Sequence, residues 1–401
     1  MKSEALRKYL ITLICSLLVI AVSFAVHSSV YRVDKDKTIR VGFVYVGDAS
    51  DAYTNNFFKA QHEIEKLYGD HVETIAKYNV PEDVFEPALV ELIEEDCDLI
   101  FSTSYGYGEV LREYASKYPN TQFCQATCSN ANDEPILDNY HTYMGEIHEG
   151  RYICGVVAGM KLKELIDNDK ITSDMAKIGY VAAFPFSEVI SGYTAFFLGV
   201  RSVVPTATMT VKYTDTWGNY RLEKEMTEEL IDEGCVIISQ HSDTAGPAAA
   251  CEETDRLQIV YYVSYNESMR DIAPTTYLIG SKINWCPYMT KAVEAVLLDK
   301  DIESHVKGNV NGNDIGSGFD NDWVQMLEIN DFVAPVGTQK TVDKLIDDFK
   351  NKRIQVFKGD YIGVDPFDPT DTIDLNDGYI ESEFSSAPSF HYVLKDVITV
   401  E

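Results

Sequence analysis

The stretch KIGYVAAFPFSEVISGYTAFFLGV, residues 177–200, has the pattern of a buried strand, a loop and an amphipathic helix. A unit of this kind directs a helix N-terminus and an open loop beyond the carboxyl end of the strand, where open α/β sheets bind ligands. The sequence therefore predicts an α/β fold with ligand-facing loops at the carboxyl ends of its strands.

A second copy of this unit lies earlier in the chain. VGFVYVG at 41–47 matches IGYVAAF at 178–184, and LIEEDCDLIFS at 92–102 matches LIDEGCVIISQ at 230–240. The offsets agree, since 178 − 41 = 137 and 235 − 97 = 138. We infer that one α/β half is used twice, and two similar lobes facing each other imply a cleft.

Length and charge limit the function further. The 401 residues suffice for two lobes of about 150 residues with additional segments. The formal net charge of −30 repels phosphate backbones and anionic membrane surfaces, so we expect no nucleic-acid partner.

The first 27 residues have the composition of a targeting segment. Three basic residues occur up to position 8, and an uncharged run follows at 9–26, which suits a signal peptide or a single membrane anchor. Cys15 follows the bulky Ile14, which argues against lipid attachment. Residues 23–25 offer a cleavage site, and both cleavage and retention as an anchor stay open. In either case we expect the protein outside the cytoplasm.

Seven cysteines follow this segment, and an odd number argues against a full disulfide framework. Cys97 and Cys235 fall at equivalent points of the repeat, where small core residues are expected. Cys124 and Cys128 could bridge or bind a metal, but no histidine or third cysteine lies nearby in the sequence.

Loops that follow predicted strands carry aromatic, carboxamide and hydroxyl side chains. Such groups suit a planar ligand with polar edges, because aromatic faces stack on rings and carboxamides both donate and accept hydrogen bonds. We expect ligand contacts from Tyr53, Thr54, Asn55, Ser104, Tyr105, Gly106, Phe184, Glu188, Trp217, His241, Asp243, Asn266, Asn284 and Trp285.

A structural interpretation competes with the ligand-binding one in the first loop. Asn55 could cap the following helix while Tyr53 packs as a hydrophobic staple. For Trp217, a tryptophan in a polar loop, we favour a ligand contact over packing.

The sequence contains no motif typical of catalysis. GxSxG, HExxH, P-loop and paired metal-ligand motifs are absent, and His241, Ser242 and Asp243 are too close in sequence to meet as a triad. Residues 306–322 are rich in Gly, Asn and Asp, but they lack the sixth-position glycine and the final glutamate of a calcium loop. We expect a binding protein with no catalytic residues, metal or cofactor.

The sequence resembles the basic membrane protein family of bacterial solute-binding proteins, which are purine-nucleoside receptors that serve ABC importers. The resemblance covers nearly all of 39–360. It rests on FSTSYGYGEVL, YMGEIHEGRYICGVVAG, IGYVAAFPFSEVISGYTAFFLG, YTDTWGNY, SQHSDTAGPAAA and INWCPYMTKAV.

This resemblance implies a two-lobed periplasmic-binding-protein type I fold, in which each lobe is a parallel sheet flanked by helices and the lobes close on a ligand by hinge motion. It also implies a ring sandwiched between aromatic side chains of opposite lobes, with Tyr53, Tyr105, Phe184 and Trp217 as candidates. Relatives tend to carry tryptophan at the position of Tyr53, and a lipid-attachment motif is missing here.

A further departure concerns the ligand. The family usually has Gly-x-Asp where this chain has Ser264-Tyr265-Asn266, so a carboxylate that would hold ribose hydroxyls is replaced by a carboxamide. This replacement favours a bare base over a nucleoside.

We therefore expect an extracytoplasmic, monomeric receptor that binds a purine base or nucleoside and delivers it to the membrane subunits of an ABC importer. An anchored sensor or scaffold is the alternative, and a nucleoside hydrolase would need a metal or carboxylate cluster in the cleft. The expected lobes are 38–146 plus 275–300, and 147–274 plus 301–360, followed by an extension at 361–401.

Overall fold

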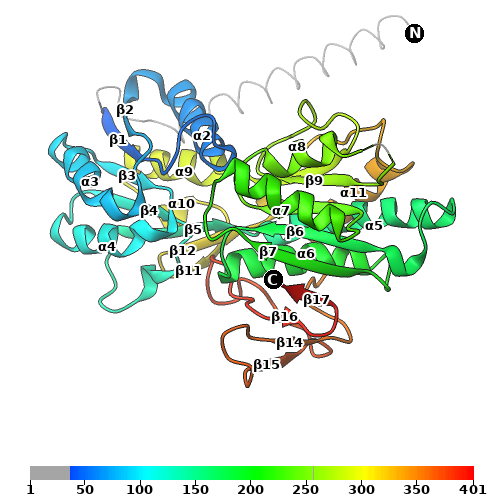
Figure 1. Cartoon of the computed structure of the whole chain (residues 1–401). Coiled ribbons are helices and arrows are strands. Elements are labelled where there is room, and N and C mark those ends of the chain that lie inside the picture. The colour runs from blue at the N-terminus through cyan, green and yellow to red at the C-terminus, as the bar shows by residue number, and fades with distance from the viewer. Residues whose placement is uncertain (1–36, 256) are drawn as a thin grey trace, which may run out of the picture.

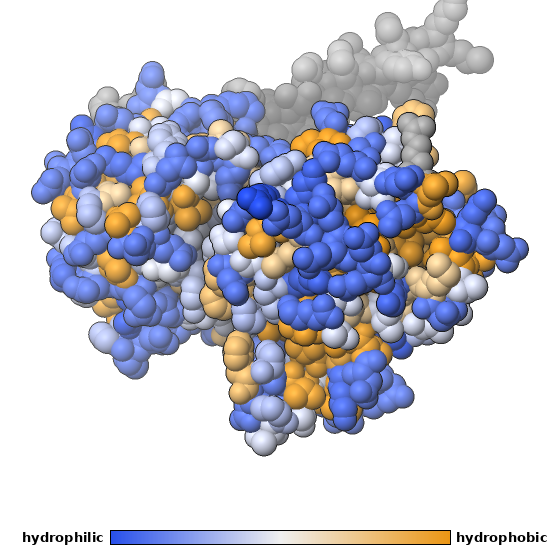
Figure 2. Space-filling view, in the orientation of Figure 1, coloured by the Kyte–Doolittle hydropathy of each residue, from blue (hydrophilic) through white to orange (hydrophobic). Residues whose placement is uncertain are grey.

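A computed structural model describes residues 37–255 and 257–401, so the predicted leader at 1–27 lies outside the described residues. Figure 1 shows two α/β lobes side by side, with a smaller module from the C-terminal part of the chain against them. Hydrophilic side chains cover most of the face seen in Figure 2, as the strong negative charge leads one to expect. Across 37–255 and 257–401, no helix has the length and apolar character needed to cross a membrane.

The first lobe contains a sheet of order β11-β12-β5-β4-β3-β1-β2. All neighbours in it are parallel except β11 and β12. Its strands are β1 (Ile39–Val44), β2 (Val72–Lys77), β3 (Leu99–Ser102), β4 (Gln122–Ala126), β5 (Tyr140–Gly145), β11 (Asn309–Asn311) and β12 (Asp314–Ser317). Its helices are α2 (Ala52–Tyr68), α3 (Phe85–Glu94), α4 (Gly108–Lys117), α9 (Cys286–Leu297) and α10 (Ile302–His305).

The second lobe contains a sheet of order β13-β10-β9-β8-β6-β7-β17, in which only β13 is antiparallel to its neighbour. Its strands are β6 (Lys177–Ala182), β7 (Thr208–Tyr213), β8 (Ile237–His241), β9 (Tyr261–Tyr265), β10 (Tyr277–Ile283), β13 (Val324–Met326) and β17 (Ile398–Val400). Its helices are α5 (Ile147–Asp167), α6 (Ser187–Arg201), α7 (Tyr220–Asp232), α8 (Gly246–Glu253) and α11 (Thr338–Lys350).

The two sheets confirm the internal repeat. β1 lies between β2 and β3 just as β6 lies between β7 and β8. Even the register is shared, because Val41 faces Leu99 in the first sheet and Ile178 faces Ile237 in the second. The seven cysteines of the described chain are free, and Cys97 and Cys235 are buried as expected.

Three strands, β10, β11 and β12, lie in the opposite lobe from the one expected. β10 pairs with β9 in the second sheet, although 275–300 was expected in the first lobe. β12 pairs with β5 in the first sheet, although 301–360 was expected in the second lobe. The chain crosses between the lobes after β5, after β10 and after β12. The first crossing falls at the expected boundary after residue 146, whereas the second and third lie later in the chain than the expected boundaries at 275 and 301.

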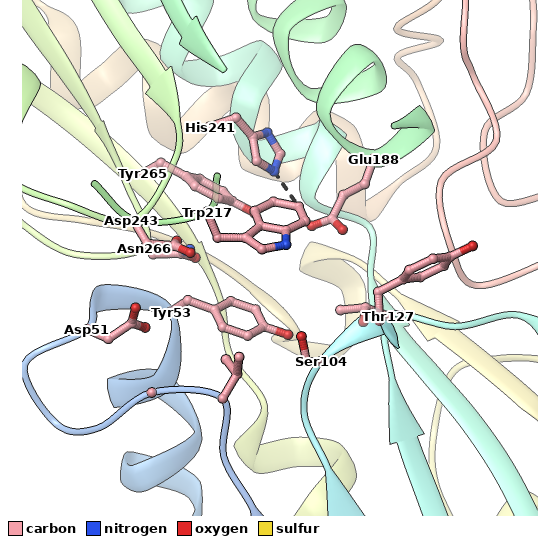
Figure 3. Close-up of a pocket in the computed structure, with 14 residues that line it drawn as sticks. Asp51, Tyr53, Ser104, Thr127, Glu188, Trp217, His241, Asp243, Tyr265 and Asn266 are labelled. Atoms are coloured by element: carbon pink, nitrogen blue, oxygen red, sulfur yellow. Dashed lines mark ion pairs between the residues drawn. The ribbon is translucent and has the colours of Figure 1, made fainter. Parts of the chain in front are cut away.

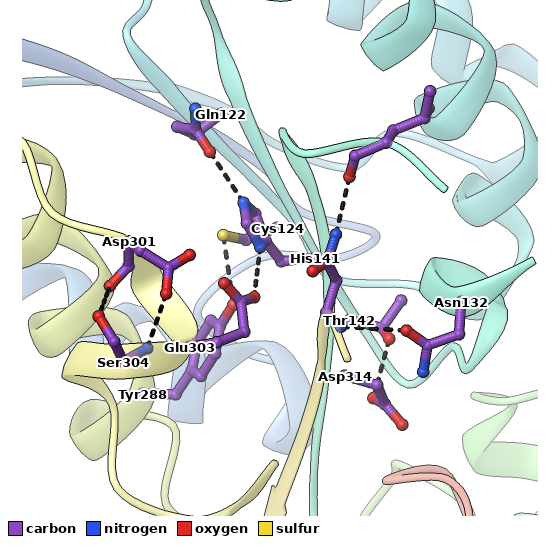
Figure 4. A network of polar contacts seen from close by, with 12 residues as sticks. Gln122, Cys124, Asn132, His141, Thr142, Tyr288, Asp301, Glu303, Ser304 and Asp314 are labelled. Atoms are coloured by element: carbon purple, nitrogen blue, oxygen red, sulfur yellow. Dashed lines mark hydrogen bonds and ion pairs between the residues drawn. The ribbon is translucent and has the colours of Figure 1, made fainter. Parts of the chain in front are cut away.

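Polar contacts fasten the segment that contains α9, α10 and β12 to the first sheet (Figure 4). His141 on β5 contacts Glu303 of α10 through Nδ1, at 2.5 Å, and Gln122 of β4 through Nε2, at 2.8 Å. The Thr142 hydroxyl donates to Asp314 of β12 at 2.8 Å. These buried contacts explain why this segment belongs to the first lobe.

In the second lobe, α5 and α6 pack with their backbones in contact. A Cβ placed on Gly155 would lie 1.9 Å from the carbonyl oxygen of Phe196, and one placed on Gly199 would lie 2.2 Å from that of Tyr152. Only glycine fits at such distances, so these two glycines permit the close packing of α5 and α6.

The region predicted as an extension forms a module of its own and then returns to the second lobe. β14 (Ile362–Val364), β15 (Thr372–Asp374) and β16 (Val393–Leu394) make a three-stranded antiparallel sheet of order β15-β14-β16. After it, β17 pairs with β7 and covers the edge of the second sheet.

Candidate ligand-binding site

The carboxyl ends of both sheets face one cavity of about 220 Å³ between the lobes. Its walls come almost equally from the two halves. They are Val46, Gly47, Asp51, Tyr53, Ser104, Tyr105 and Thr127 from the first lobe, and Glu188, Trp217, Gly218, His241, Asp243, Tyr265 and Asn266 from the second.

Eight of the residues expected to contact a ligand line this cavity. They are Tyr53, Ser104, Tyr105, Glu188, Trp217, His241, Asp243 and Asn266. Each ends or follows a strand, or begins the helix after it, as expected for loops at the carboxyl edge of a parallel sheet.

The other six expected residues are not part of the cavity wall. Thr54 is fully buried, and Gly106 donates its N–H to Glu82. Phe184 lies behind Trp217, with ring centroids 5.4 Å apart. Asn55, Asn284 and Trp285 instead contact Glu267, Asp322 and Phe57, respectively.

Sequence reasoning missed Asp51, Thr127 and Tyr265 among the side chains of the wall. Asp51 precedes the expected helix start, and its carboxylate accepts a hydrogen bond from the N–H of Thr54 at 2.6 Å. It is therefore the N-cap of α2, a role considered for Asn55. The sequence did carry a signal for this cap, because an aspartate three residues before an N–H of the first helical turn is a typical N-cap.

Tyr53 and Trp217 lie on opposite sides of the cavity (Figure 3). The Tyr53 hydroxyl donates to the carbonyl of Thr103 at 2.5 Å, and its ring packs against Phe57 with centroids 5.1 Å apart. Tyr53 thus both packs and lines the cavity, so the two interpretations of this loop are compatible.

The position of Trp217 is set by its own loop and the next one. Its carbonyl accepts from the N–H of Asp243 at 2.9 Å, and its ring meets Phe184 edge-on and Phe186 at a tilt. These contacts hold the Trp217 ring in place on the side of the cavity opposite Tyr53.

Three carboxyl groups, those of Asp51, Glu188 and Asp243, face the cavity. Burial raises the pKa of Asp243 well above its usual value, and the negative charges of Asp51, Glu223 and Glu188 raise it further. Asp243 therefore keeps its proton to a higher pH than an ordinary aspartate, and in its protonated form the carboxyl group offers one O–H donor and one acceptor.

His241 is a second unusual group in the wall. Its Nε2 lies 3.5 Å from a Glu188 oxygen, and burial lowers its pKa, so the imidazole is neutral at pH 7. Within the described chain, neither ring nitrogen has a hydrogen-bond partner, and the same holds for the amide nitrogen of Asn266. Buried polar groups without partners are costly, so these atoms are suited to bind the edge of a ligand.

The lobes also touch around the cavity. Glu267 of the second lobe accepts from Asn55 at 2.9 Å and pairs with Lys59 at 3.1 Å, and Asn56 donates to the carbonyl of Asn266 at 2.9 Å. Elsewhere at the cavity, the rings of Tyr105 and Phe186 lie 6.0 Å apart. These polar and aromatic contacts between the lobes indicate that the lobes are closed over the cavity.

Comparisons with known proteins agree with this architecture. A family model described as Bmp, ABC transporter substrate-binding protein PnrA-like, matches residues 38–358. A protein of Brucella abortus named "Purine-binding protein BAB2_0673" is 30% identical over 264 residues, which cover 65% of this chain and 70% of the relative. A Haloferax volcanii protein named "Putative ABC transporter glucose-binding protein TsgA13" is 30% identical over 261 residues, covering 65% of this chain and 61% of the relative.

Solved structures share the fold at low identity. A solute-binding protein of an ABC transporter system from Aeropyrum pernix K1 superimposes with a TM-score of 0.63 at 16% identity, covering 79% of this chain and 92% of that one. Its counterpart from Conexibacter woesei gives a TM-score of 0.60 at 15% identity, covering 79% and 98%. The two-lobed fold of periplasmic solute-binding proteins predicted from the sequence is thus confirmed.

Proposed function

We propose, because the chain belongs to the Bmp family of PnrA-like ABC transporter substrate-binding proteins, that its cleft binds a purine base and presents it to an ABC importer outside the cytoplasm. Membership of a receptor family also accounts for the lack of catalytic motifs in the sequence. The ligand is the part of this proposal that the site itself must support.

The observation that carries the proposal is the pair of aromatic side chains, Tyr53 and Trp217, on opposite lobes of one cavity. Aromatic faces attract planar rings, and stacking on a base is worth roughly 1–3 kcal/mol in nucleic-acid binders. A ring held between two lobes would also favour their closure, because each lobe contributes one face of the clamp.

The polar groups around the clamp match the edge of a purine. Asp243, whose pKa burial raises, supplies a donor beside an acceptor in its protonated form, and the amide nitrogen of Asn266 supplies another donor. Purine edges alternate ring nitrogens that accept with N–H or exocyclic groups that donate. A hydrocarbon ring would leave these groups unpaired.

The size of the cavity favours a base over a nucleoside. At about 220 Å³ it falls below the range of about 300–1,000 Å³ typical of pockets for drug-sized ligands. Asn266, in place of the family's aspartate, likewise removes a carboxylate that would hold ribose hydroxyls.

A thermal-shift screen against purine bases, nucleosides, pyrimidines, glucose and amino acids tests the proposal. A ligand at 100 times its dissociation constant stabilises the bound state by about 2.7 kcal/mol, so a true ligand gives a clear rise in Tm. We expect purine bases to give the largest rise. A rise with glucose alone would overturn the purine assignment, and conversion of inosine or adenosine into products would overturn the assignment as a receptor.

A further inference from the structure

A second, larger cavity of about 530 Å³ lies away from the ligand cleft, where the interlobe crossings meet the C-terminal part of the chain. Glu146 comes from the crossing after β5, and Asp320 from the crossing after β12. Residues 379–383 close another side. That segment lies beyond residue 358, where the family match ends, so the family does not account for this cavity.

Negative charge predominates in the walls. Glu146, Glu149, Asp320 and Glu381 line the cavity, and Lys352 is the cation that faces them. Glu381 is engaged by the structure, since it accepts from the Ser191 hydroxyl at 2.8 Å. In Glu146 and Glu149, by contrast, only one carboxylate oxygen accepts a hydrogen bond from the described residues. The donor is the Asn309 amide for Glu146 and the Phe319 N–H for Glu149.

Two further polar atoms at this cavity have no partner. His148 lies in the wall with 9% of its surface exposed, and its Nδ1 has no hydrogen-bond partner in 37–255 and 257–401. The hydroxyl of Ser382, also in the wall, is unpartnered in the same part of the chain. Because a buried polar atom without a partner costs free energy, both atoms point to a ligand that supplies hydrogen bonds here.

The nature of the walls distinguishes between kinds of cation. Phe349, Phe357 and Tyr379 add aromatic surface, which suits alkyl chains and attracts ammonium groups through their ring faces. A metal ion would need three or more ligand atoms gathered closely. Among the described residues such a gathering occurs elsewhere, at Asp365, Asp371 and His391, and not in this cavity.

We propose that this second cavity binds an aliphatic di- or polyamine, whose ammonium groups pair with Glu146 and Glu149 and whose alkyl chain lies along the aromatic wall. Bound there, the amine contacts two of the interlobe crossings as well as the C-terminal module. The site is thus placed to couple amine binding to the closure of the ligand cleft.

The titration of the walls supports the same ligand. Burial, together with neighbouring carboxylates, raises the pKa of Glu146 to about 7 and that of Glu149 to about 8, while Lys352 lowers both. Burial lowers the pKa of His148 to about 4, so this side chain stays neutral near pH 7. An ammonium ion favours the ionised carboxylates, so binding releases protons and should tighten between about pH 6 and about pH 8.

Isothermal titration calorimetry with putrescine and spermidine tests the proposal on the whole protein. We expect saturable binding with proton release, and about tenfold weaker binding in Glu149→Gln, which keeps the shape but removes the charge. Glu383→Gln, at the exposed mouth of the cavity, should weaken binding by a smaller factor and serves as a second variant if Glu149→Gln does not fold. Glu94→Gln, exposed on α3, is the matched control and should bind as the parent does.

Other outcomes would overturn the proposal. Amine binding that Trp217→Ala abolishes and Glu149→Gln leaves intact would place the amine in the ligand cleft. If the parent protein binds Mg²⁺ or Ca²⁺ but neither amine, and Glu149→Gln loses the metal binding, the cavity is a metal site. Absence of binding by either amine at millimolar concentration would also contradict it.

Discussion

Trp217 and Tyr53 line opposite sides of the cavity between the lobes, so under the proposed function they should decide whether it accepts a planar ring. Each ring packs against another aromatic ring, Phe57 for Tyr53 and Phe184 for Trp217. Phe184 was expected to be part of the clamp, but it supports Trp217 from behind instead. A sequence shows which loops carry aromatic side chains. Which of those rings lines the cavity and which packs behind it depends on how the loops fold against one another.

Replacing Trp217 should separate stacking from packing. Trp217→Ala removes one face of the clamp and should weaken binding of the purine base about tenfold or more, since 1.4 kcal/mol corresponds to about a factor of ten. Trp217→Phe should keep much of the affinity, because a flat face remains. Calorimetry on both variants checks this, and unchanged affinity in a folded Trp217→Ala protein would assign tryptophan to packing alone.

Asp243 should make ligand binding depend on pH. Burial raises its pKa, so it keeps its proton to a higher pH than an ordinary aspartate, and it loses its O–H donor as the pH rises through its pKa. We expect the affinity of the parent protein for the base to fall at alkaline pH. Asp243→Asn keeps a donor at every pH and should flatten this decline. Equal pH profiles for the two proteins, measured between about pH 5 and about pH 9, would contradict the donor role.

At the scale of elements, the strands with strong hydrophobic patterns and turn residues after them were predictable. β1, β3, β6 and β8 overlap the repeated stretches at 41–47, 92–102, 178–184 and 230–240, and that repeat indicated the two lobes. β5 and β12 were missed as partners, because their pairing joins segments far apart in the chain. The second and third crossings depend on such long-range pairings, so the boundaries expected at 275 and 301 were wrong, whereas the crossing after β5 falls at the expected boundary after residue 146.

The candidate site was predictable to a similar extent. Loops after parallel strands were correctly expected to face one cleft. Asn55 was expected to contact the ligand or to cap the helix, but its amide donates to Glu267 of the other lobe, so it contributes to the contact between lobes. Contacts between lobes depend on their final orientation, which no local pattern encodes.

The contact between α5 and α6 should be intolerant of added volume. In Gly155→Ala the new methyl group would overlap the backbone of Phe196, which cannot move aside as a flexible side chain could. We expect the free energy of unfolding to fall by about 3 kcal/mol or more. Chemical denaturation measures it, with Ser116→Ala on the exposed side of α4 as the control. A loss below about 1 kcal/mol would show that the helices can separate without cost.

At the scale of the whole molecule, the contacts of Glu267 with Asn55 and Lys59 hold the lobes together. A ligand that binds both lobes should favour this closed form, seen as a smaller radius of gyration in solution scattering. Glu267→Gln should weaken both closure and apparent affinity by a few-fold, because less of the protein is in the binding-competent form. If a proven ligand leaves the radius of gyration unchanged at saturation, the hinge model fails.

Buried carboxylates should make the protein less stable as the pH rises. The pKa of Glu146 is raised to about 7 and that of Glu149 to about 8, so below about pH 4.5 both the folded and unfolded states are protonated. Between that pH and about 8 the unfolded state binds fewer protons than the folded one, and stability falls.

This fall in stability with pH can be measured by chemical denaturation at two pH values. We expect the free energy of unfolding, without amines, to be lower at pH 8 than at pH 5, with roughly 1–3 kcal/mol of the difference due to Glu149. Glu149→Gln should reduce the difference, and Glu94→Gln, exposed on α3, should not. A protein whose stability rises over this range would contradict the raised pKa values.

β17 has a consequence for handling the protein. It pairs with β7, which would otherwise form the outer edge of the second sheet with unpaired N–H and C=O groups. An exposed edge of that kind is a template for strands of other molecules. Removing residues 398–401, or a fusion that pulls them away, should therefore leave a protein that still binds its ligand but self-associates into aggregates.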